Sequence, residues 1–294
     1  MRGKQKRCFG AVLIIVAFAL PVLAEDGQGW TFSGRFQGSS NSSGVVMKAD
    51  PTVGYNFNGH FQTYMGVPFY MVNQSSSTPT SLSTLTSSGF INGIGNAYVG
   101  FRLGVENPAV NYTSTLEATA PTGDKAKGFS TGRATVDWTN SFSHKFESVT
   151  PFADVGMSNT VSDTSFFVRP FSSLGLVSHF DGGATFKIAP VVSVGALAYG
   201  VQASGQQRIF SKVKNSGSSA KPATSTQGPG AKVNRVFETN SETVGSADLA
   251  NDHGVSSWLA VRAGSNTDFQ VGYTRSMGYD LNTLFWGVKF RFGN

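Results

Sequence analysis

The feature that most constrains this sequence is a repeated alternation of apolar and polar side chains. In the closing stretch LFWGVKFRFGN, Leu284, Trp286 and Val288 fall on one side of an extended chain, and Lys289 and Arg291 fall on the other. Successive side chains of a β-strand point to opposite faces, so this pattern predicts a strand with one apolar face. The pattern recurs in about twelve segments of about ten residues each, which is typical of a transmembrane barrel. We expect these strands at residues 29–38, 45–57, 60–72, 97–105, 110–120, 132–142, 151–158, 171–187, 191–201, 255–262, 268–277 and 284–294.

The connections between these segments support a barrel independently. Every second connection is short, as at residues 58–59 and 106–108, whereas the others include the polar stretches 76–89, 121–132 and 205–251. Short periplasmic turns and long external loops are typical of outer-membrane barrels. We therefore expect an all-β fold, a transmembrane antiparallel up-and-down β-barrel with both ends of the mature chain in the periplasm. Ten or fourteen strands are also compatible with the pattern, and the facing of 191–201, which is apolar on both sides, is open.

Composition favours lipid over a soluble core as the environment of the apolar faces. A soluble β-sandwich also alternates, but its outer face normally carries many Lys and Glu residues. Here only 14% of the residues are charged, and the polar faces consist largely of Ser, Thr, Asn, Gln and Gly. Lipid offers no water to an open sheet edge, so the sheet must close. We expect the chain in the outer membrane of a Gram-negative-type bacterium, in contact with outer-membrane lipid and the barrel-insertion machinery.

The first residues have the layout of a cleaved signal peptide. A cationic start is followed by an apolar run from Phe9 to Leu20 and by small or short side chains before a cut after Ala24. An uncleaved anchor is the alternative, but the run is shorter than the ~20 residues that span a bilayer. We predict a signal peptide at 1–24 and a barrel at 25–294, with a long external loop at about 205–251.

Removal of this leader changes what the composition implies. Four of the 23 basic residues lie in it and none of the 17 acidic ones, so the mature chain has 19 basic and 17 acidic residues and a net charge of +2. No basic excess remains that would indicate nucleic-acid binding. The single cysteine, Cys8, is also removed, which excludes disulfides and thiolate chemistry from the mature chain.

Enzymatic and cofactor chemistry have little support in the sequence. Two arrangements resemble catalytic pairs, Asp252 beside His253 and Ser172 or Ser173 with His179, but neither has a recognisable catalytic motif around it. No His, Asp and Glu cluster has the spacing of metal ligands. Gly-rich pieces lack the Lys-Ser/Thr ending of a phosphate loop. We predict no enzyme, no cofactor and no metal.

The polar faces define the side chains expected inside the barrel. Eight cations and six anions would share the lumen, where unpaired charges are costly, so pairing across strands is expected. This predicts a narrow, weakly anion-favouring pore or a lumen closed by its own ion pairs. The expected lumen residues are Arg35, Lys48, Asp50, Arg102, Glu117, Arg133, Asp137, Asp154, Asp181, Lys187, Arg262, Asp268, Lys289 and Arg291.

Aromatic residues near the ends of apolar faces indicate membrane interfaces. Such rings favour the headgroup level, where an apolar body and a polar rim are both accommodated. We expect Trp30, Trp286, Phe290 and Phe292 in this role.

The segment PTGDKAKGFSTGRATVDWTNSFSH resembles a known family. It carries Pro121, Thr122, Gly123 and Asp124, then a Gly-rich loop, then a strand. This is similar to the outer-membrane barrels grouped as the "MetA pathway of phenol degradation" family, transporters distantly related to the fatty-acid channel class. The resemblance implies passive uptake of small hydrophobic or aromatic solutes. The alternative is a structural or surface-recognition barrel that acts through its long external loops, and the oligomeric state is open.

Overall fold

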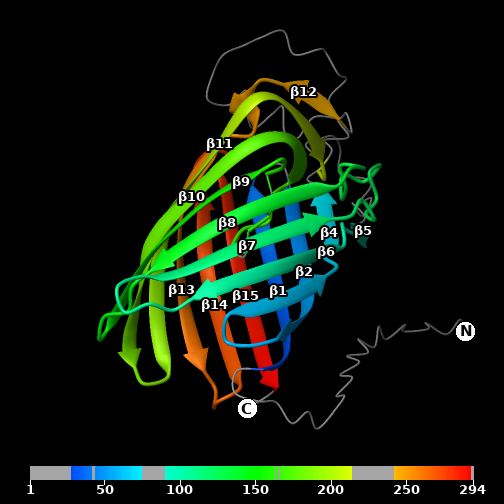
Figure 1. Cartoon of the computed structure of the whole chain (residues 1–294). Coiled ribbons are helices and arrows are strands. Elements are labelled where there is room, and N and C mark those ends of the chain that lie inside the picture. The colour runs from blue at the N-terminus through cyan, green and yellow to red at the C-terminus, as the bar shows by residue number, and fades with distance from the viewer. Residues whose placement is uncertain are drawn as a thin grey trace, which may run out of the picture.

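The chain folds as one antiparallel sheet that closes on itself (Figure 1). The computed structural model describes residues 28–41, 44–74, 90–161, 163–164, 166–213 and 242–292. The expected signal peptide therefore lies outside the described residues. The strands are β1 (Gly29–Asn41), β2 (Gly44–Asn56), β3 (Phe61–Gly66), β4 (Phe69–Gln74), β5 (Ile91–Ile94), β6 (Tyr98–Val105), β7 (Asn111–Thr119), β8 (Thr135–Ser143), β9 (Val149–Ser158), β10 (Phe171–Ala189), β11 (Val192–Ser211), β12 (Thr243–Gly245), β13 (Asp252–Arg262), β14 (Thr267–Ser276) and β15 (Leu281–Phe292), and the short helix η1 spans Ala247–Leu249.

The wall of the barrel has twelve strand positions, which we call staves. β3 and β4 both pair with β2, so together they form one interrupted stave. β6 pairs with β3 and β5 pairs with β4, so β5 and β6 together form the next stave. β12 pairs only with β11 and lies outside the ring. The prediction of twelve strands is thus confirmed, and ten or fourteen are excluded.

The first and last strands close the barrel. β1 runs antiparallel to β15, with Trp30 opposite Phe292 and Gln37 opposite Phe285, and its other edge pairs with β2. The last strand, predicted from the alternation that begins at Leu284, therefore pairs with the first strand, as a closed barrel requires. Of the described strands in the ring, β1, β2 and β15 thus have partners on both edges at the closure, as a sheet in lipid requires.

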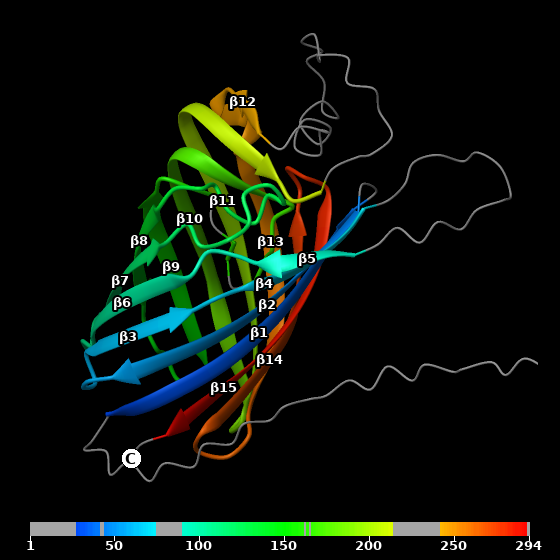
Figure 2. The same cartoon turned by 90° about the vertical axis from the view of Figure 1, so that its right-hand side faces the viewer.

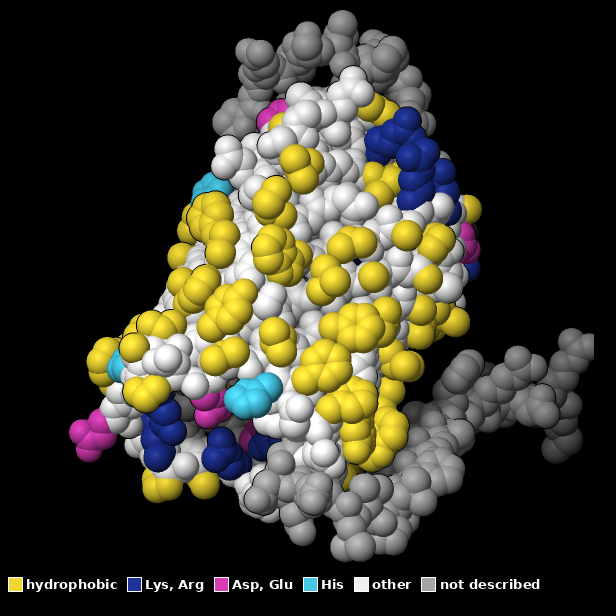
Figure 3. Space-filling view, in the orientation of Figure 1, with side chains coloured by type: hydrophobic (Ala, Val, Ile, Leu, Met, Phe, Trp, Pro, Cys, Tyr) yellow, Lys and Arg dark blue, Asp and Glu magenta, His cyan; other side chains and the backbone are white. Residues whose placement is uncertain are grey.

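The outer surface of the wall is apolar. Phe101, Leu103, Leu116 and Trp138 are 46–50% exposed, and the polar residues between them face inward. Figure 3 shows apolar side chains spread over the wall, with charged side chains gathered towards its two ends. A closed barrel with this surface belongs in a bilayer, so the architecture agrees with the outer-membrane location.

The two ends of the barrel differ in their connections. At one end the connections are short, with only residues 190–191 between β10 and β11 and residues 263–266 between β13 and β14. We call this the turn end and the opposite one the loop end. The expected alternation of connection lengths is confirmed. Within the described residues, no helix is long and apolar enough to cross a membrane.

β11 differs most from its prediction. It continues to Ser211, ten residues past its expected end, so it takes over the start of the expected loop 205–251, which also contains β12 and η1. The reason is that Gln207 and Ile209 are buried against the interior of the loop end. The open question of facing is settled as well, because Leu197 points into the barrel. Figure 2 shows that β11 and β12 project beyond the rest of the wall.

Candidate solute pathway in the lumen

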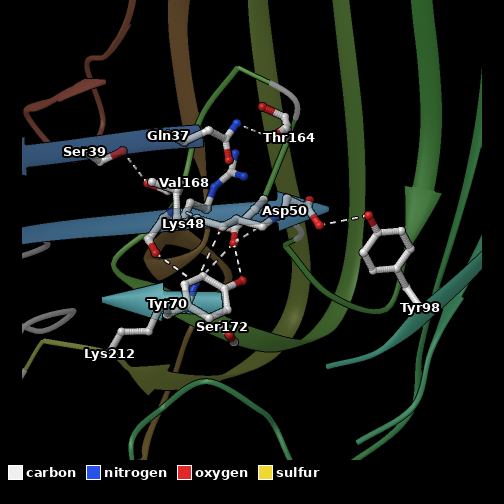
Figure 4. A network of polar contacts seen from close by, with 12 residues as sticks. Gln37, Ser39, Lys48, Asp50, Tyr70, Tyr98, Thr164, Val168, Ser172 and Lys212 are labelled. Atoms are coloured by element: carbon white, nitrogen blue, oxygen red, sulfur yellow. Dashed lines mark hydrogen bonds and ion pairs between the residues drawn. The ribbon is translucent and has the colours of Figure 1, made fainter. Parts of the chain in front are cut away.

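The connection between β9 and β10 folds into the barrel. We call its described residues, 159–161, 163–164 and 166–170, the inward segment. The amide of Gln37 donates a hydrogen bond to the carbonyl oxygen of Thr164 at 2.8 Å, and the hydroxyl of Ser39 donates one to that of Val168 at 2.6 Å (Figure 4). Strands that are distant in sequence thus satisfy the backbone of a segment that would otherwise lie unpaired in the lumen.

An apolar cluster seals the loop end around this segment. Phe167 and Val168 of the inward segment are at most 1% exposed, and Phe171 at the start of β10 is fully buried. They form one cluster with Val46 and Val72 from the wall. The cluster occupies the position where a solute would enter from the loop end, so the barrel is closed there.

Aromatic side chains hold the tip of the inward segment. Phe166 stacks on Trp258 with ring centroids 5.2 Å apart, and it meets the edge of Phe285 at 5.4 Å. Phe152 lies next to Trp258 at 6.2 Å. Trp258, Phe285 and Phe152 belong to the lumen-facing side of their strands, where an aromatic ring has no lipid to contact. Their partner is the inward segment, which sequence reasoning did not identify.

Asp163 is the ionic anchor of the inward segment. Its carboxylate lies 3.3 Å from the Nζ atom of Lys212 and 3.9 Å from that of Lys48. It accepts hydrogen bonds from the Tyr70 hydroxyl at 2.7 Å and from the Arg169 backbone N–H at 2.8 Å. Burial raises the pKa of Asp163, but Lys212 and Lys48 outweigh this effect, and the pKa lies below its usual value. The carboxylate is therefore held ionised.

The buried position disfavours the charged form of Lys212. Burial lowers the pKa of Lys212 to about 8, although Asp163 acts in the opposite direction. Its ammonium group also lies over the ring of Tyr70, 4.4 Å from the centroid. Lys48 has a second partner, Asp50, at 3.1 Å, whereas Lys212 has none beyond Asp163 among the ion pairs of the described chain. The anchor therefore holds two buried lysines on one shared carboxylate.

The residues weighed as catalytic pairs have structural partners instead. Asp252 is 4% exposed and accepts hydrogen bonds from Ser276 and Tyr199, whereas His253 is exposed on the opposite face of β13. Ser173 is fully buried and accepts a hydrogen bond from the N–H of Val161 at 2.7 Å. His179 lies six residues further along β10, roughly 20 Å away at strand spacing. Neither pair has the geometry of a hydrolytic site.

A cavity of about 990 Å³ occupies the lumen beside the inward segment. It runs from Lys145 and Glu147 at the turn end to Asp163 and Phe129 at the loop end. It therefore opens towards the turn end and is covered at the loop end. The expected lumen residues that line it are Arg35, Lys48, Asp50, Arg102, Glu117, Lys187, Arg262, Asp268 and Lys289.

Five expected lumen residues do not line this cavity. Asp137, Asp154 and Asp181 face the lumen from β8 to β10, and Asp137 lies 3.1 Å from His179. Arg291 is held by Asp268 at 2.5 Å. Arg133 is exposed in the connection before β8, because that strand starts at Thr135, three residues later than predicted.

Two tyrosines, Tyr64 and Tyr98, line the cavity. Tyr64 donates a hydrogen bond to Glu117 at 3.0 Å, and Tyr98 donates one to Asp50 at 2.9 Å. The Tyr64 ring lies on Gly100, where an added Cβ would come within 2.0 Å of it. The Tyr98 hydroxyl lies over Gly66 in the same way, so both rings lie flat along the wall and leave the lumen free.

The Pro-Thr-Gly-Asp segment docks onto a break in the wall. Residues 95–97 interrupt the stave between β5 and β6. The Thr122 hydroxyl accepts a hydrogen bond from the N–H of Ala97 at 2.7 Å and donates one to the carbonyl of Gly95 at 3.3 Å. The N–H of Gly123 donates to the Asn96 side chain. The motif thus supplies partners to backbone groups that the broken ladder leaves free.

The expected interface aromatics are all on the outer face, at different heights. Trp30 and Phe292 lie opposite each other at the turn end, with Phe290 adjacent. Trp286 lies in the middle of β15, stacked on Phe36 at 6.1 Å, rather than at a strand end. In the described chain no group of three or more His, Cys, Asp or Glu side chains could hold a metal ion.

The fold is similar to that of solved outer-membrane β-barrels. No protein-family profile and no curated protein matches the sequence. Among solved structures, the COG4313 outer membrane channel from Pseudomonas putida F1 superimposes with a TM-score of 0.58 at 12% identity, covering 94% of this chain and all of that one. The NanC porin superimposes with a TM-score of 0.50 at 10% identity, covering 89% of this chain and all of that one. The fold is thus that of a porin-like outer-membrane β-barrel.

Proposed function

We propose that this protein is an outer-membrane channel for the passive uptake of small solutes. The observation that carries the proposal is the cavity, which is lined by charged and hydroxyl side chains and reaches from the turn end to the inward segment. A polar lumen inside an apolar wall is the arrangement that carries solutes through lipid. The turn end faces the periplasm, and the inward segment is the external gate.

The solute class follows from the residues that surround the gate. Release of the inward segment breaks the bonds to Gln37 and Ser39 and the ion pairs of Asp163, and it joins the cavity to the outside. Phe129 and Phe171 line the cavity beneath the gate. Together with the resemblance of the Pro-Thr-Gly-Asp segment, they support small hydrophobic or aromatic solutes.

Planar-bilayer recording and liposome swelling test the channel. The wild type is expected to stay mostly closed with rare openings. The double variant Gln37→Ala, Ser39→Ala removes two wall contacts of the inward segment and is expected to raise the open probability several-fold. Ser33→Ala is the matched control, because Ser33 lines the cavity on the same strand and does not bond the segment. If every folded variant fails to conduct, a structural role replaces the channel.

A surface-recognition role has one observation in its favour. β11 and β12 project beyond the wall, with Gln207 opposite Gly245, and Glu242 pairs with Arg208 and Lys125. They frame residues 214–241, which lie outside the described residues. Deletion of 214–241 separates the two roles, since recognition predicts lost adhesion at unchanged permeability and gating predicts changed permeability.

A further inference from the structure

Basic side chains gather on the outer surface at the loop end. Lys125 and Arg133 belong to the connection between β7 and β8, and Arg208 belongs to the projecting part of β11. The side chains of Lys125 and Arg208 are 55% and 49% exposed, and Arg133 is exposed as well. Figure 3 shows Lys and Arg side chains at this end, next to apolar side chains of the wall. We call these three residues the basic patch. None of them lines the lumen cavity, so the patch is separate from the proposed solute pathway.

Direct contacts bring the basic patch together from two parts of the chain. The carboxylate of Glu242 lies 3.6 Å from the Nζ atom of Lys125 and 3.4 Å from the guanidinium group of Arg208. The side chain of Lys125 also runs along Gly132, because its Cδ atom is 3.0 Å from the position that a Cβ on Gly132 would take. Arg133 is the next residue, so its backbone lies beside the Lys125 side chain.

Positive charge is in excess in the basic patch. Its three cations face one carboxylate, that of Glu242, and Arg133 has no carboxylate within 4.0 Å among the ion pairs of the described chain. Lys127 lies nearby in the same connection, but Asp124 pairs with it at 3.5 Å, so it adds no net charge. Exposed ion pairs contribute only about 0–1 kcal/mol, so Glu242 does not prevent a second anion from binding.

The connection that carries the basic patch is held rigidly. Gly128 has a φ of 74°, and a Cβ there would lie 2.1 Å from the carbonyl oxygen of Ser211, so the two backbones are in close contact. Phe129 is only 2% exposed. The Thr131 hydroxyl accepts a hydrogen bond from the N–H of Arg133 at 3.3 Å and donates one to its carbonyl oxygen at 3.1 Å. The backbone of Arg133 is therefore already ordered, and binding of an anion requires only its side chain to settle.

The basic patch lies at the edge of the apolar band of the wall. β8 begins at Thr135, and its outward residues Val136 and Trp138 are 45% and 49% exposed. Arg133 precedes Val136 by three residues, which span at most about 10 Å of chain. Long connections lie on the external side of outer-membrane barrels. The patch is thus at the level of the headgroups of the outer leaflet, where the membrane presents phosphorylated glycolipid.

We propose that the basic patch binds the phosphate groups of lipopolysaccharide in the outer leaflet. Guanidinium groups bind phosphate through paired, charge-assisted hydrogen bonds, and an ammonium group adds a point charge. Basic clusters beside a membrane attract anionic headgroups in this way. The acyl chains of the same lipid would lie along Val136 and Trp138. This site goes beyond the proposed channel function and does not depend on it.

Native mass spectrometry of the folded barrel in detergent, with lipid A added as the phosphorylated probe, tests the site. The double variant Lys125→Gln, Arg133→Gln is expected to raise the dissociation constant of lipid A about tenfold or more, since it removes two charge-assisted contacts. Lys145→Gln, Lys187→Gln is the matched control, because it removes two exposed cations from the turn end and changes the net charge equally. The control is expected to change the dissociation constant less than about twofold.

Several outcomes would overturn the proposal. Equal weakening by the turn-end control would reduce the basic patch to a general positive potential, and unchanged binding by the loop-end variant would exclude it as the site. Dephosphorylated lipid A that binds as tightly as lipid A would assign recognition to the acyl chains. Inorganic phosphate that competes at the concentration of lipid A would assign the patch to a free anion.

Heat-dependent gel mobility verifies that each variant is folded, and Arg208→Gln serves if the loop-end double variant does not fold. Conductance plays no part in this measurement. A barrel that binds lipid A as expected but never conducts would retain the basic patch and refute the channel, so the two proposals fail separately.

Discussion

At the scale of single residues, the proposed gate depends most directly on Asp163. Two lysines from distant parts of the chain, a tyrosine hydroxyl and a backbone N–H all converge on its carboxylate. Removal of that charge leaves Lys48 and Lys212 buried beside each other without their shared anion. Breaking a buried ion pair on one side is far more costly than never forming it.

Acid is therefore expected to open the channel. The pKa of Asp163 in the closed form lies below that of a free aspartate, about 3.9. Its stabilisation of closure is thus present above about pH 4 and is lost as the pH falls through the lower, closed-form pKa. Open probability, measured in bilayers from pH 7 to pH 3, should rise at the acidic end.

The variant Asp163→Asn should be open already at pH 7 and should lose this acidic response. Asp154→Asn is the control, since Asp154 faces the lumen from β9 away from the anchor. A wild type whose open probability is flat down to pH 3 would contradict the role of Asp163.

At the scale of strands and connections, alternation predicts the staves because lipid on one side and a polar lumen on the other enforce period 2 along each strand. The two interruptions, at 67–68 and 95–97, lie where Pro68 and Gly95 meet through a backbone hydrogen bond. They could not be predicted, because the apolar side continues across them. The one sequence signal of the inward segment is the apolar pair Phe166 and Phe167 in a connection between two expected strands.

The docking of Thr122 at the second interruption is open to direct measurement. Thr122→Val keeps the shape of the side chain but removes the acceptor for Ala97 and the donor for Gly95, which is expected to cost about 1–3 kcal/mol of local stability. Hydrogen exchange at Ala97 should accelerate. Thr113→Val on β7 is the control, and an unchanged exchange rate at Ala97 would show that the motif does not hold the break.

At the scale of the whole molecule, lipid on the outside and charge on the inside predict opposite tolerances for adjacent residues. Leu116 is 46% exposed on the outer face of β7, while its neighbour Thr115 lines the cavity. Leu116→Arg is expected to lower the free energy of unfolding in vesicles by about 2–4 kcal/mol. Thr115→Arg should leave that free energy nearly unchanged and alter ion selectivity instead. Equal losses from both would contradict the assignment of faces.

The residues that face the lumen could largely be predicted from the sequence, whereas which of their charges lie close together could not. Facing follows from counting residues along a strand, so Arg35 and Arg102 were expected inside. Which lumen charges lie close together depends on strand tilt and on the diameter of the closed ring, which no single segment encodes. The part of the lumen taken by the inward segment depends in the same way on contacts between residues more than a hundred positions apart.

The flat tyrosines of the lumen imply that the width of the pathway is set by residues without side chains. Tyr64 can lie along the wall only because Gly100 leaves room beneath it, and Tyr98 depends on Gly66 in the same way. A methyl group at either glycine would tilt the ring into the bore. Homologues that replace these glycines should therefore have smaller rings opposite them. Each glycine and its tyrosine should thus change together, because the pair sets the width of the pathway.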